Sequence, residues 1–506
     1  MNFNRRPEVK NFSFIPPNKS HTPGTGTQDP KSILSTPHAG RGTLFEKIWR
    51  RHVIRELEDD AVLLHVDRHI IHECTSGAAF ATLAKNGHKV RCPNLTYGVV
   101  DHIVSTMPGR RWDTFAGGKE FITLLRQNTA FHGIGLIDVQ DPRQGIEHVI
   151  AAELGISLPG TTLVCGDSHT STCGATGCLA WGIGTSEVAH VLATQSIVQR
   201  RPKIMRVTFD GLLQPGVFSK DLILYLIGEA GIAAGAGHAV EYAGSAIRAL
   251  SMDARQTICN MSIELGARCG MIAPDDTTLS YLYGRQFTPS GALWEQAVGY
   301  WRTLRSDDDA AFDKEIRIDC GSISPQVTWG TTPGDVGGIG DRVPDPALVR
   351  DARRRQAMEQ ALGYMGLQPH EQLEGLKIDT AFIGSCTNSR LSDLEAAAEI
   401  VRGRKVPQHV RALVAPGSVP VKKAAESMGL DKVFIDAGFE WRETGCSMCV
   451  AINDDFVAPG QRCISTSNRN FENRQGPRSR THLASPATVA ASAVSGVIAD
   501  VRKFRK

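Results

Sequence analysis

The sequence predicts an α/β protein in which helices pack on wound sheets of parallel strands. Short apolar segments at residues 61–66, 99–100 and 161–165 alternate with helical segments such as the one around residues 186–188. Each of these strands is followed directly by polar residues, as expected where a parallel sheet presents its carboxyl edge to a ligand. Fifty glycines against 6% aromatic residues favour many tight turns over an aromatic-rich β-sandwich.

The length and charge of the chain narrow the functions that it can have. Its 506 residues suffice for roughly three domains. A formal net charge of +3 is too small, for this length, to indicate a nucleic-acid or membrane partner. No stretch approaches about 18 uninterrupted apolar residues, which argues against a membrane span. Twelve cysteines without a disulfide-like framework or an apolar signal segment indicate reduced thiols and a cytoplasmic location.

The first 41 residues predict a disordered extension, because they are rich in Pro, Gly, Ser and Thr and lack periodicity. An organelle-targeting signal is the alternative. It rests on Arg5 and Arg6 and is opposed by Glu8, Asp29 and the prolines.

Three domains are predicted after this extension. A segment of helical spacing at residues 43–49 opens the first, and an apolar strand at residues 204–209 opens the second. A connection rich in Gly, Pro and Asp, at residues 325–346, leads to the third. The predicted domains are residues 42–205, 206–345 and 346–506.

Three strand ends carry a carboxylate beside an imidazole. The first strand ends in the run 67–69, the second in Asp101 and His102, and the third in the run 167–169, which contains Asp167, Ser168 and His169. Ligands in wound sheets bind beyond the carboxyl ends of the strands, so these three ends predict one shared crevice. Taken alone, Asp101 and His102 are better explained as a polar pair at a strand end than as catalytic residues.

Three cysteines form a candidate metal centre. Cys446 and Cys449 are three residues apart on a small, polar loop, and Cys386 lies in a similar loop 60 residues upstream. Three thiolates can hold a [4Fe–4S] cluster and leave one iron without a protein ligand, free to act as a Lewis acid. The spacing alone leaves a zinc site, a redox pair and a packing accident open. The glycine-rich residues 233–238 fit neither common phosphate loop.

Four motifs in fixed order give the chain a family resemblance. They are residues 166–170, 384–389, 445–449 and 467–471. The chain resembles the aconitase superfamily and, within it, the large subunits of isopropylmalate-type hydro-lyases, from about residue 43 to the C-terminus. The resemblance implies three α/β/α domains around a [4Fe–4S] cluster held by Cys386, Cys446 and Cys449.

The resemblance also implies roles for individual residues. Asp101 and His102 match the pair that protonates the departing hydroxyl, and His148 matches a second active-site imidazole. Asp167 and His169 match a further pair beside the iron-bound water, with Glu241 as the carboxylate near the labile iron. Residues that match those contacting the cluster or the substrate carboxylates are Ser168, Asn468, Arg469 and Arg474.

Physical chemistry agrees with these roles and leaves plain alternatives for some residues. A carboxylate such as Asp101 raises the pKa of a neighbouring imidazole and orients it. A guanidinium fork matches a substrate carboxylate, although Arg469 and Arg474 alone can be read as solvated side chains. Glu241 can equally be a cap or an ion-pair partner.

Three departures from the family pattern put the exact substrate in doubt. Asn473 stands where a glycine is usual, and Cys173 stands where relatives often have a histidine. Residues 114–127 differ from the sequence that is usual in dehydratases.

The resemblance implies a two-chain enzyme. Single-chain aconitases carry the proton-abstracting serine on a fourth, swivelling domain, for which this sequence leaves no room, so a separate small subunit is expected to supply it. The expected reaction interconverts 2- and 3-isopropylmalate in leucine biosynthesis. Alternatives are dehydration of another hydroxy-diacid (citramalate, a homocitrate-like acid or an arylmalate), an RNA-binding protein that has lost its cluster, or a structural zinc site.

Overall fold

The computed structural model describes residues 42–504, so the extension predicted for residues 1–41 lies outside the described range. The described chain opens with α1 (Leu44–His52). Its N-cap residue Thr43 accepts a hydrogen bond from Glu46 N (3.2 Å), and Glu46 Oε2 accepts one from Thr43 N (2.9 Å). This reciprocal capping fixes the start of the helix, and the helix predicted at residues 43–49 is confirmed.

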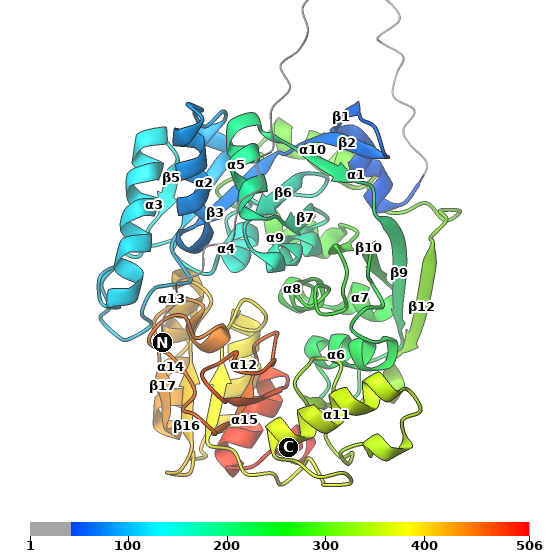
Figure 1. The fold of residues 1–506 in the computed structure, drawn as a ribbon, viewed down its shortest axis with the longest axis vertical. Coiled ribbons are helices and arrows are strands. Elements are labelled where there is room, and N and C mark those ends of the chain that lie inside the picture. The colour runs from blue at the N-terminus through cyan, green and yellow to red at the C-terminus, as the bar shows by residue number, and fades with distance from the viewer. Residues whose placement is uncertain (1–41, 505–506) are drawn as a thin grey trace, which may run out of the picture. The chain divides into compact units, whose positions relative to one another are not determined.

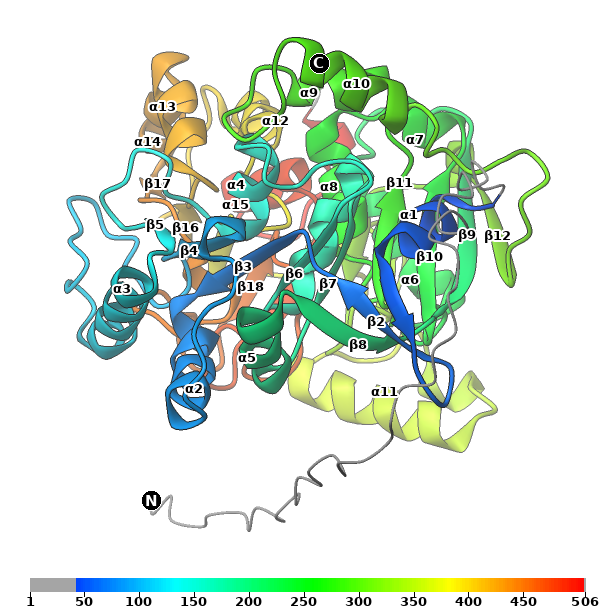
Figure 2. The same ribbon diagram turned by 90° about the horizontal axis from the view of Figure 1, so that it is seen from above.

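The first sheet is parallel, with strand order β5-β4-β3-β6-β7 (Figure 1). Its strands are β3 (Arg68–His72), β4 (Thr96–Val99), β5 (Gly135–Ile137), β6 (Thr162–Cys165) and β7 (Leu179–Gly182). Its helices are α2 (Glu73–Lys85), α3 (Lys119–His132), α4 (Glu147–Glu153) and α5 (Thr185–Thr194). Figure 2 shows α2, α3 and α5 on one side of β3 and α4 on the other.

The winding of this sheet creates a binding crevice. The chain runs outward from β3 to β5 and then returns to place β6 on the other side of β3. The carboxyl ends of β3 and β6 therefore flank a topological switch point, which is where open α/β sheets bind ligands.

The second sheet is also parallel, with order β11-β10-β9-β12. Its strands are β9 (Lys203–Asp210), β10 (His238–Ala243), β11 (Cys269–Ile272) and β12 (Lys314–Asp319). Its helices are α6 (Ser219–Ala230), α7 (Ser245–Ala249), α8 (Met252–Asn260), α9 (Asp276–Leu282) and α10 (Ala292–Trp301). The strand predicted at residues 204–209 is confirmed as β9, so a domain boundary between residues 205 and 206 would fall inside a strand.

The third sheet repeats the winding of the first, with order β17-β16-β15-β18-β19. Its strands are β15 (Thr380–Ile383), β16 (Arg411–Val414), β17 (Phe439–Trp441), β18 (Arg462–Ser465) and β19 (Arg480–Leu483). Its helices are α11 (Ala352–Met365), α12 (Leu391–Val401), α13 (Val419–Ser427), α14 (Leu430–Ala437) and α15 (Pro486–Ser495). The switch point here lies between β15 and β18, so the residues that follow these two strands meet.

Two antiparallel pieces complete the described chain. One sheet, β1-β2-β8, is formed by β1 (Val53–Glu56), β2 (Ala61–His65) and β8 (Ser196–Arg200). The other is a hairpin of β13 (Gln326–Thr328) and β14 (Val336–Gly338), which lies within the predicted connection at residues 325–346.

The position of β2 corrects one sequence prediction. Because β2 belongs to the antiparallel sheet, the residues that follow it do not reach the crevice. Asp67 instead pairs with His52 (Nε2 to Oδ2, 2.6 Å). The strand that delivers polar residues to the switch point is the next one, β3, which ends at His72 and is followed by Glu73.

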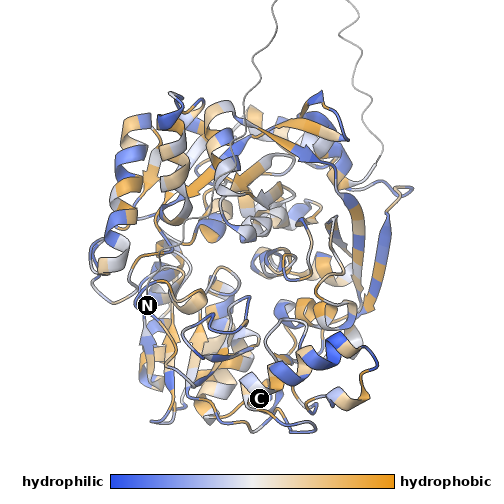
Figure 3. Ribbon diagram, in the orientation of Figure 1, coloured by the Kyte–Doolittle hydropathy of each residue, from blue (hydrophilic) through white to orange (hydrophobic). Residues whose placement is uncertain are grey.

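Apolar side chains hold the sheets together. Ile204, Ala239 and Cys269 of the second sheet are buried in the same cluster as Leu44 and Trp181. Figure 3 shows the inner strands as mainly hydrophobic and the outer helix α11 as mainly hydrophilic. Three parallel sheets with flanking helices confirm the α/β class. Within residues 42–504, no helix is long and apolar enough to cross a membrane.

Candidate active site

The strand ends of the first and third sheets meet around one pocket of about 180 Å³. His102, Asp167, Ser168 and His169 approach it from the first sheet. The third sheet contributes five further lining residues: Cys386, Cys446, Cys449, Arg469 and Arg474. His148, at the start of α4, also lines the pocket.

His102 is held between two carboxylates. Its Nδ1 lies 2.6 Å from Asp101 Oδ1 and its Nε2 lies 3.2 Å from Asp167 Oδ2. Burial opposes the charged imidazole, but the charges of Asp101 and Cys446 and the hydrogen bond to Asp167 raise the pKa of His102 well above its usual value. His102 is therefore protonated at neutral pH and can donate a proton.

Asp167 is the centre of the group of imidazoles. Its Oδ1 lies 3.1 Å from His148 Nε2 and 3.5 Å from His169 Nδ1. Burial alone would raise the pKa of Asp167, but the hydrogen bond from His102 and the close contacts with His148 and His169 hold it well below the usual value. The carboxylate stays charged and fixes the three rings.

Two buried glutamates, Glu73 and Glu147, hold the backbone and side chains of the Asp101–His102 pair in place. Glu73 Oε1 accepts hydrogen bonds from the backbone of His102 (2.7 Å) and Ile103 (2.6 Å). Glu147 N donates to Asp101 Oδ2 (2.8 Å), and burial, with the charges of Asp101 and Asp167, raises the pKa of the Glu147 carboxyl well above its usual value. Both glutamates were missed from the sequence, although Glu73 directly follows the strand that ends at His72.

The cluster loops are tied to the first sheet by a buried arginine. Arg110 donates from Nη1 to the carbonyl oxygen of Thr444 and from Nη2 to Gln144 Oε1 (2.8 Å). Gly445 adopts φ +151° and lies so close to this region that a Cβ there would sit 3.3 Å from the Asp101 carbonyl oxygen. These contacts place the loop that carries Cys446 beside His102.

The three cysteines surround the floor of the pocket. All three are buried, in one apolar cluster with Ile146 and Val149. Burial raises the pKa of the Cys386 thiol to about 12, with the Cys449 thiolate adding to the effect, so a metal must displace its proton. Amide groups face the sulfur of Cys386, which accepts hydrogen bonds from Asn260 Nδ2 (3.2 Å) and Asn468 Nδ2 (3.4 Å).

The spacing of the thiols fits a multinuclear iron centre better than a single ion. A tetrahedral zinc with Zn–S bonds of about 2.3 Å requires sulfurs about 3.8 Å apart. Among the described residues, the groups that bring three ligand atoms within 4.8 Å of one another consist of other side chains, and the three cysteines do not form such a group. Thiolates that bind different irons of one cluster are spread more widely, and N–H donors to the sulfur are typical of such centres.

Comparison with known sequences agrees with this geometry. The model of the aconitase family (aconitate hydratase) matches residues 46–496. This chain belongs to the aconitase family. Membership of this family implies an iron–sulfur cluster, which the thiol arrangement fits.

The chain is also similar over most of its length to a curated relative. The chain is 59% identical over 464 residues to "3-isopropylmalate dehydratase large subunit 1" of Bradyrhizobium diazoefficiens, and the match covers 92% of this chain and 97% of the relative. Among solved structures, aconitase X of Thermococcus kodakaraensis in its holo-form has a TM-score of 0.43 and 11% identity, and the match covers 81% of this chain and 84% of that one.

One residue assigned from the family resemblance is absent from the pocket lining. Glu241 does not line the pocket, and its Oε2 accepts a hydrogen bond from Ser306 Oγ (2.6 Å). Glu264 instead contacts two residues that line the pocket, His169 and Arg469. Its Oε1 lies 3.0 Å from His169 Nε2 and accepts from Arg469 Nε (2.7 Å). The two ion pairs outweigh burial and lower the pKa of Glu264.

The remaining predicted residues reach the site. Arg469 Nη2 donates to Ser168 Oγ (3.0 Å), and Arg474 Nη2 lies 3.9 Å from Cys449 Sγ. Asn473, which stands in place of a family glycine, adopts φ +66°, a left-handed conformation that asparagine tolerates well. The substitution therefore keeps the backbone turn that precedes Arg474. Cys173 is buried within the 3₁₀ helix Ser168–Thr176 and does not line the pocket.

Proposed function

We propose that this chain is the large subunit of a 3-isopropylmalate dehydratase, a hydro-lyase that interconverts 2- and 3-isopropylmalate by dehydration and rehydration in leucine biosynthesis. The observation that carries the proposal is the 59% identity to a large subunit of this name, over 97% of its length. The convergence of the acid–base group and three thiols on one pocket supports the same chemistry.

Cys386, Cys446 and Cys449 would hold the cluster, which we take to be [4Fe–4S]. When bound, such a cluster supplies a Lewis acid for the substrate hydroxyl. Asn260 and Asn468, which donate to the Cys386 sulfur, would stabilise the negative charge of the bound thiolate.

The proton for the departing hydroxyl comes from His102. Its raised pKa keeps it charged, and Asp101 orients the ring so that Nε2 faces the pocket beside Asp167. After transfer of the proton, Asp101 and Asp167 favour its return, which suits a reaction that must run in both directions.

The arginines provide the carboxylate sites. Arg474 has a buried Nε without a hydrogen-bond partner, and Arg469 faces the pocket from its pair with Glu264. A guanidinium matches a carboxylate with two parallel hydrogen bonds, and a malate-type substrate has two carboxylates to place.

The base that removes the C–H proton would come from a small subunit. The name of the bacterial relative, a large subunit, supports a second chain. The hydroxyls that line the pocket within the described residues are Thr75 and Ser168, and Ser168 is engaged by Arg469. A cytoplasmic location is supported by the twelve cysteines, which all lie in the described range and all are free thiols.

The test is an anaerobic assay of the cluster-loaded chain mixed with its small subunit. The substrates are 2-isopropylmalate, 3-isopropylmalate, citramalate, homocitrate and phenylmalate. The reaction is followed by the absorbance of the unsaturated intermediate. We expect the highest kcat/KM for the isopropylmalates. A higher kcat/KM for citramalate, homocitrate or phenylmalate would overturn the substrate assignment. Full turnover by the chain alone would overturn the two-subunit assignment.

A further inference from the structure

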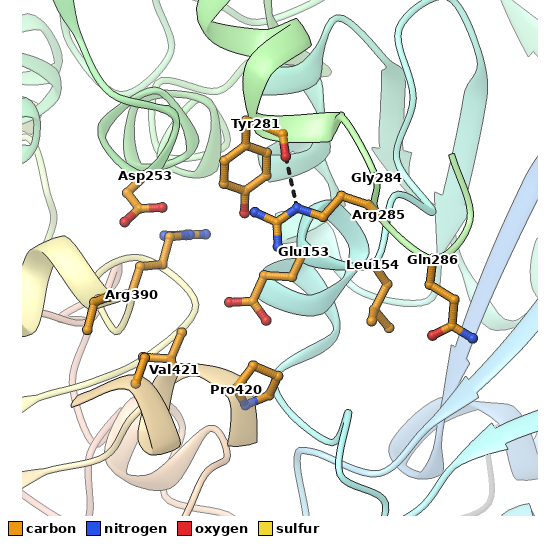
Figure 4. Close-up of a pocket in the computed structure, with 12 residues that line it drawn as sticks. Glu153, Leu154, Asp253, Tyr281, Gly284, Arg285, Gln286, Arg390, Pro420 and Val421 are labelled. Carbon is orange, nitrogen blue, oxygen red and sulfur yellow. Dashed lines mark hydrogen bonds between the residues drawn. The ribbon is translucent and has the colours of Figure 1, made fainter. Parts of the chain in front are cut away.

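A second pocket, of about 530 Å³, lies away from the active site and shares no lining residue with it. It is enclosed by α4, the N-terminus of α8, the segment after α9 and the first turns of α12 and α13 (Figure 4). Two acidic side chains, Glu153 and Asp253, and two basic ones, Arg285 and Arg390, line it. The proposed reaction uses none of these residues.

Arg390 enters this pocket with unsatisfied donors. The residue is only 2% exposed, and its Nε and Nη2 are buried without a hydrogen-bond partner. Figure 4 shows its guanidinium extending into the space between Asp253, Tyr281 and Glu153. Buried donors of a charged group without acceptors are unfavourable, so a group that accepts from both nitrogens would be strongly favoured.

Glu153 faces the same space with an unsatisfied acceptor. Its Oε2 is buried without a hydrogen-bond partner, and Figure 4 shows the carboxyl directed into the pocket. Burial and the nearby charge of Asp253 raise its pKa to about 7 although Arg390 and Arg285 oppose the shift. A cationic donor placed here would relieve both the unmet hydrogen bond and the raised pKa.

Beside Tyr281 and Gln286, the pocket has an apolar wall. Leu154, Leu391, Pro420, Val421 and Ala424 line it. The pocket therefore offers a cationic donor pair, an anionic acceptor and a hydrophobic surface in one small volume.

We propose that this pocket is a second ligand site, which binds an aliphatic α-amino acid. The carboxylate would accept from Arg390 Nε and Nη2, the ammonium group would donate to Glu153 Oε2, and the side chain would pack on Leu391 and Val421. The net charge of the pocket favours a zwitterionic ligand over a simple anion. With Glu153 ionised, the two acidic and two basic side chains cancel, and a zwitterion adds no net charge. A dicarboxylate would bring two further negative charges beside Glu153 and Asp253.

The same arginine connects the second pocket to the cluster loop. Arg390 Nη1 donates to the carbonyl oxygen of Thr387 (3.0 Å), the residue after Cys386. Its backbone N–H donates to Asp393 Oδ2 (3.1 Å), which caps α12. A ligand that fixes the free edge of this guanidinium also fixes the loop that carries one cluster thiol.

Calorimetric titration of the full, cluster-loaded chain tests the site without measuring turnover. The probes are L-leucine and L-valine. Three control compounds each lack one feature: 4-methylpentanoate has no ammonium, isoamylamine has no carboxylate, and glycine has no side chain. We expect one equivalent of L-leucine or L-valine to bind, with each control compound at least tenfold weaker. Absence of binding at 10 mM of either amino acid would overturn the proposal.

Two variants locate the binding. Glu153→Gln removes the charge that faces the ammonium group and should weaken binding at least tenfold, whereas Glu395→Gln, exposed on α12, should not change it. Ala424→Phe places a phenyl ring in the pocket from its apolar wall and should abolish binding. Lys423→Phe, at an exposed position on the same helix α13, should preserve binding. Unchanged binding by Ala424→Phe would overturn the site even if the amino acid binds elsewhere.

A spectroscopic measurement tests the connection to the cluster. With the amino acid bound, loss of the visible iron–sulfur absorbance in air should slow at least twofold, and this protection should disappear in Ala424→Phe. An equal rate with and without the amino acid would overturn the connection through Arg390.

Discussion

The backbone N–H of Cys446 donates a hydrogen bond to the carbonyl oxygen of Asp101 (3.0 Å). This bond joins the loop that carries two candidate cluster thiols to the strand end that carries Asp101 and His102, the proposed proton-donating pair. The two residues are far apart in the chain, and their parent strands belong to different sheets. The distance between the proposed metal centre and the proposed proton donor is thus fixed by a backbone contact, which is less adjustable than contacts between side chains.

Replacement of a cluster cysteine should remove the metal centre. Cys386→Ser, Cys446→Ser and Cys449→Ser should each lower bound iron and sulfide, and hydration activity should fall by more than about 100-fold because a ligand is lost. Iron and sulfide analysis after anaerobic purification measures this. Cys92→Ser is the matched control, since Cys92 is a half-buried free thiol outside the pocket. Normal iron content in all three variants would exclude these residues as the ligands.

Asp101 should be required for proton transfer but not for the cluster. Asp101→Asn removes the charge that raises the pKa of His102, so we expect kcat to fall by about 10²- to 10⁴-fold with iron content unchanged. Asp67→Asn is a matched control, because the His52–Asp67 pair has the same 2.6 Å separation away from the pocket. Equal losses of kcat in the two variants would indicate a general structural effect.

Glu264, and not Glu241, should support catalysis. Glu264→Gln weakens the ion pairs to His169 and Arg469, and kcat/KM should fall by about 10- to 100-fold. Glu241→Gln keeps a side-chain oxygen for Ser306 and should leave kcat/KM within about twofold. The reverse order of effects would restore the original assignment of Glu241.

The His169–Glu264 pair should stabilise the folded chain at neutral and acidic pH, and this contribution should be lost at alkaline pH. The pKa of His169 is raised from 6.5 to about 9 because Glu264 and Asp167 outweigh burial. A raised pKa contributes stability that is complete below pH about 6.5 and is lost as the pH rises to about 9. The full shift corresponds to on the order of 3 kcal/mol.

Thermal unfolding of the wild-type chain and of His169→Gln between pH 6 and pH 9.5 measures this contribution. The wild-type Tm should fall more steeply than that of the variant across this window. Parallel curves would show that His169 does not gain its proton affinity on folding.

Local sequence was sufficient to predict much of this protein. The helix α1, the strand β9 and the α/β class follow from hydrophobic periodicity, which is a property of neighbouring residues. The polar ends of β4 and β6 were also predicted correctly, because a side chain directly after a parallel strand has to lie at its carboxyl edge.

Tertiary structure decided which residues meet across the chain. The sequence predicts that the end of β2 lies in the crevice. Sheet pairing places the end of β3 there instead, and Asp67 forms an ion pair with His52. The pair of Arg469 with Glu264 spans 205 positions, and no local pattern distinguishes Glu264 from Glu241. The free edge of Arg390 depends likewise on side chains from α4, α8 and the segment after α9. Contacts between distant segments depend on how sheets pack, and packing is a property of the whole fold rather than of any short stretch of sequence.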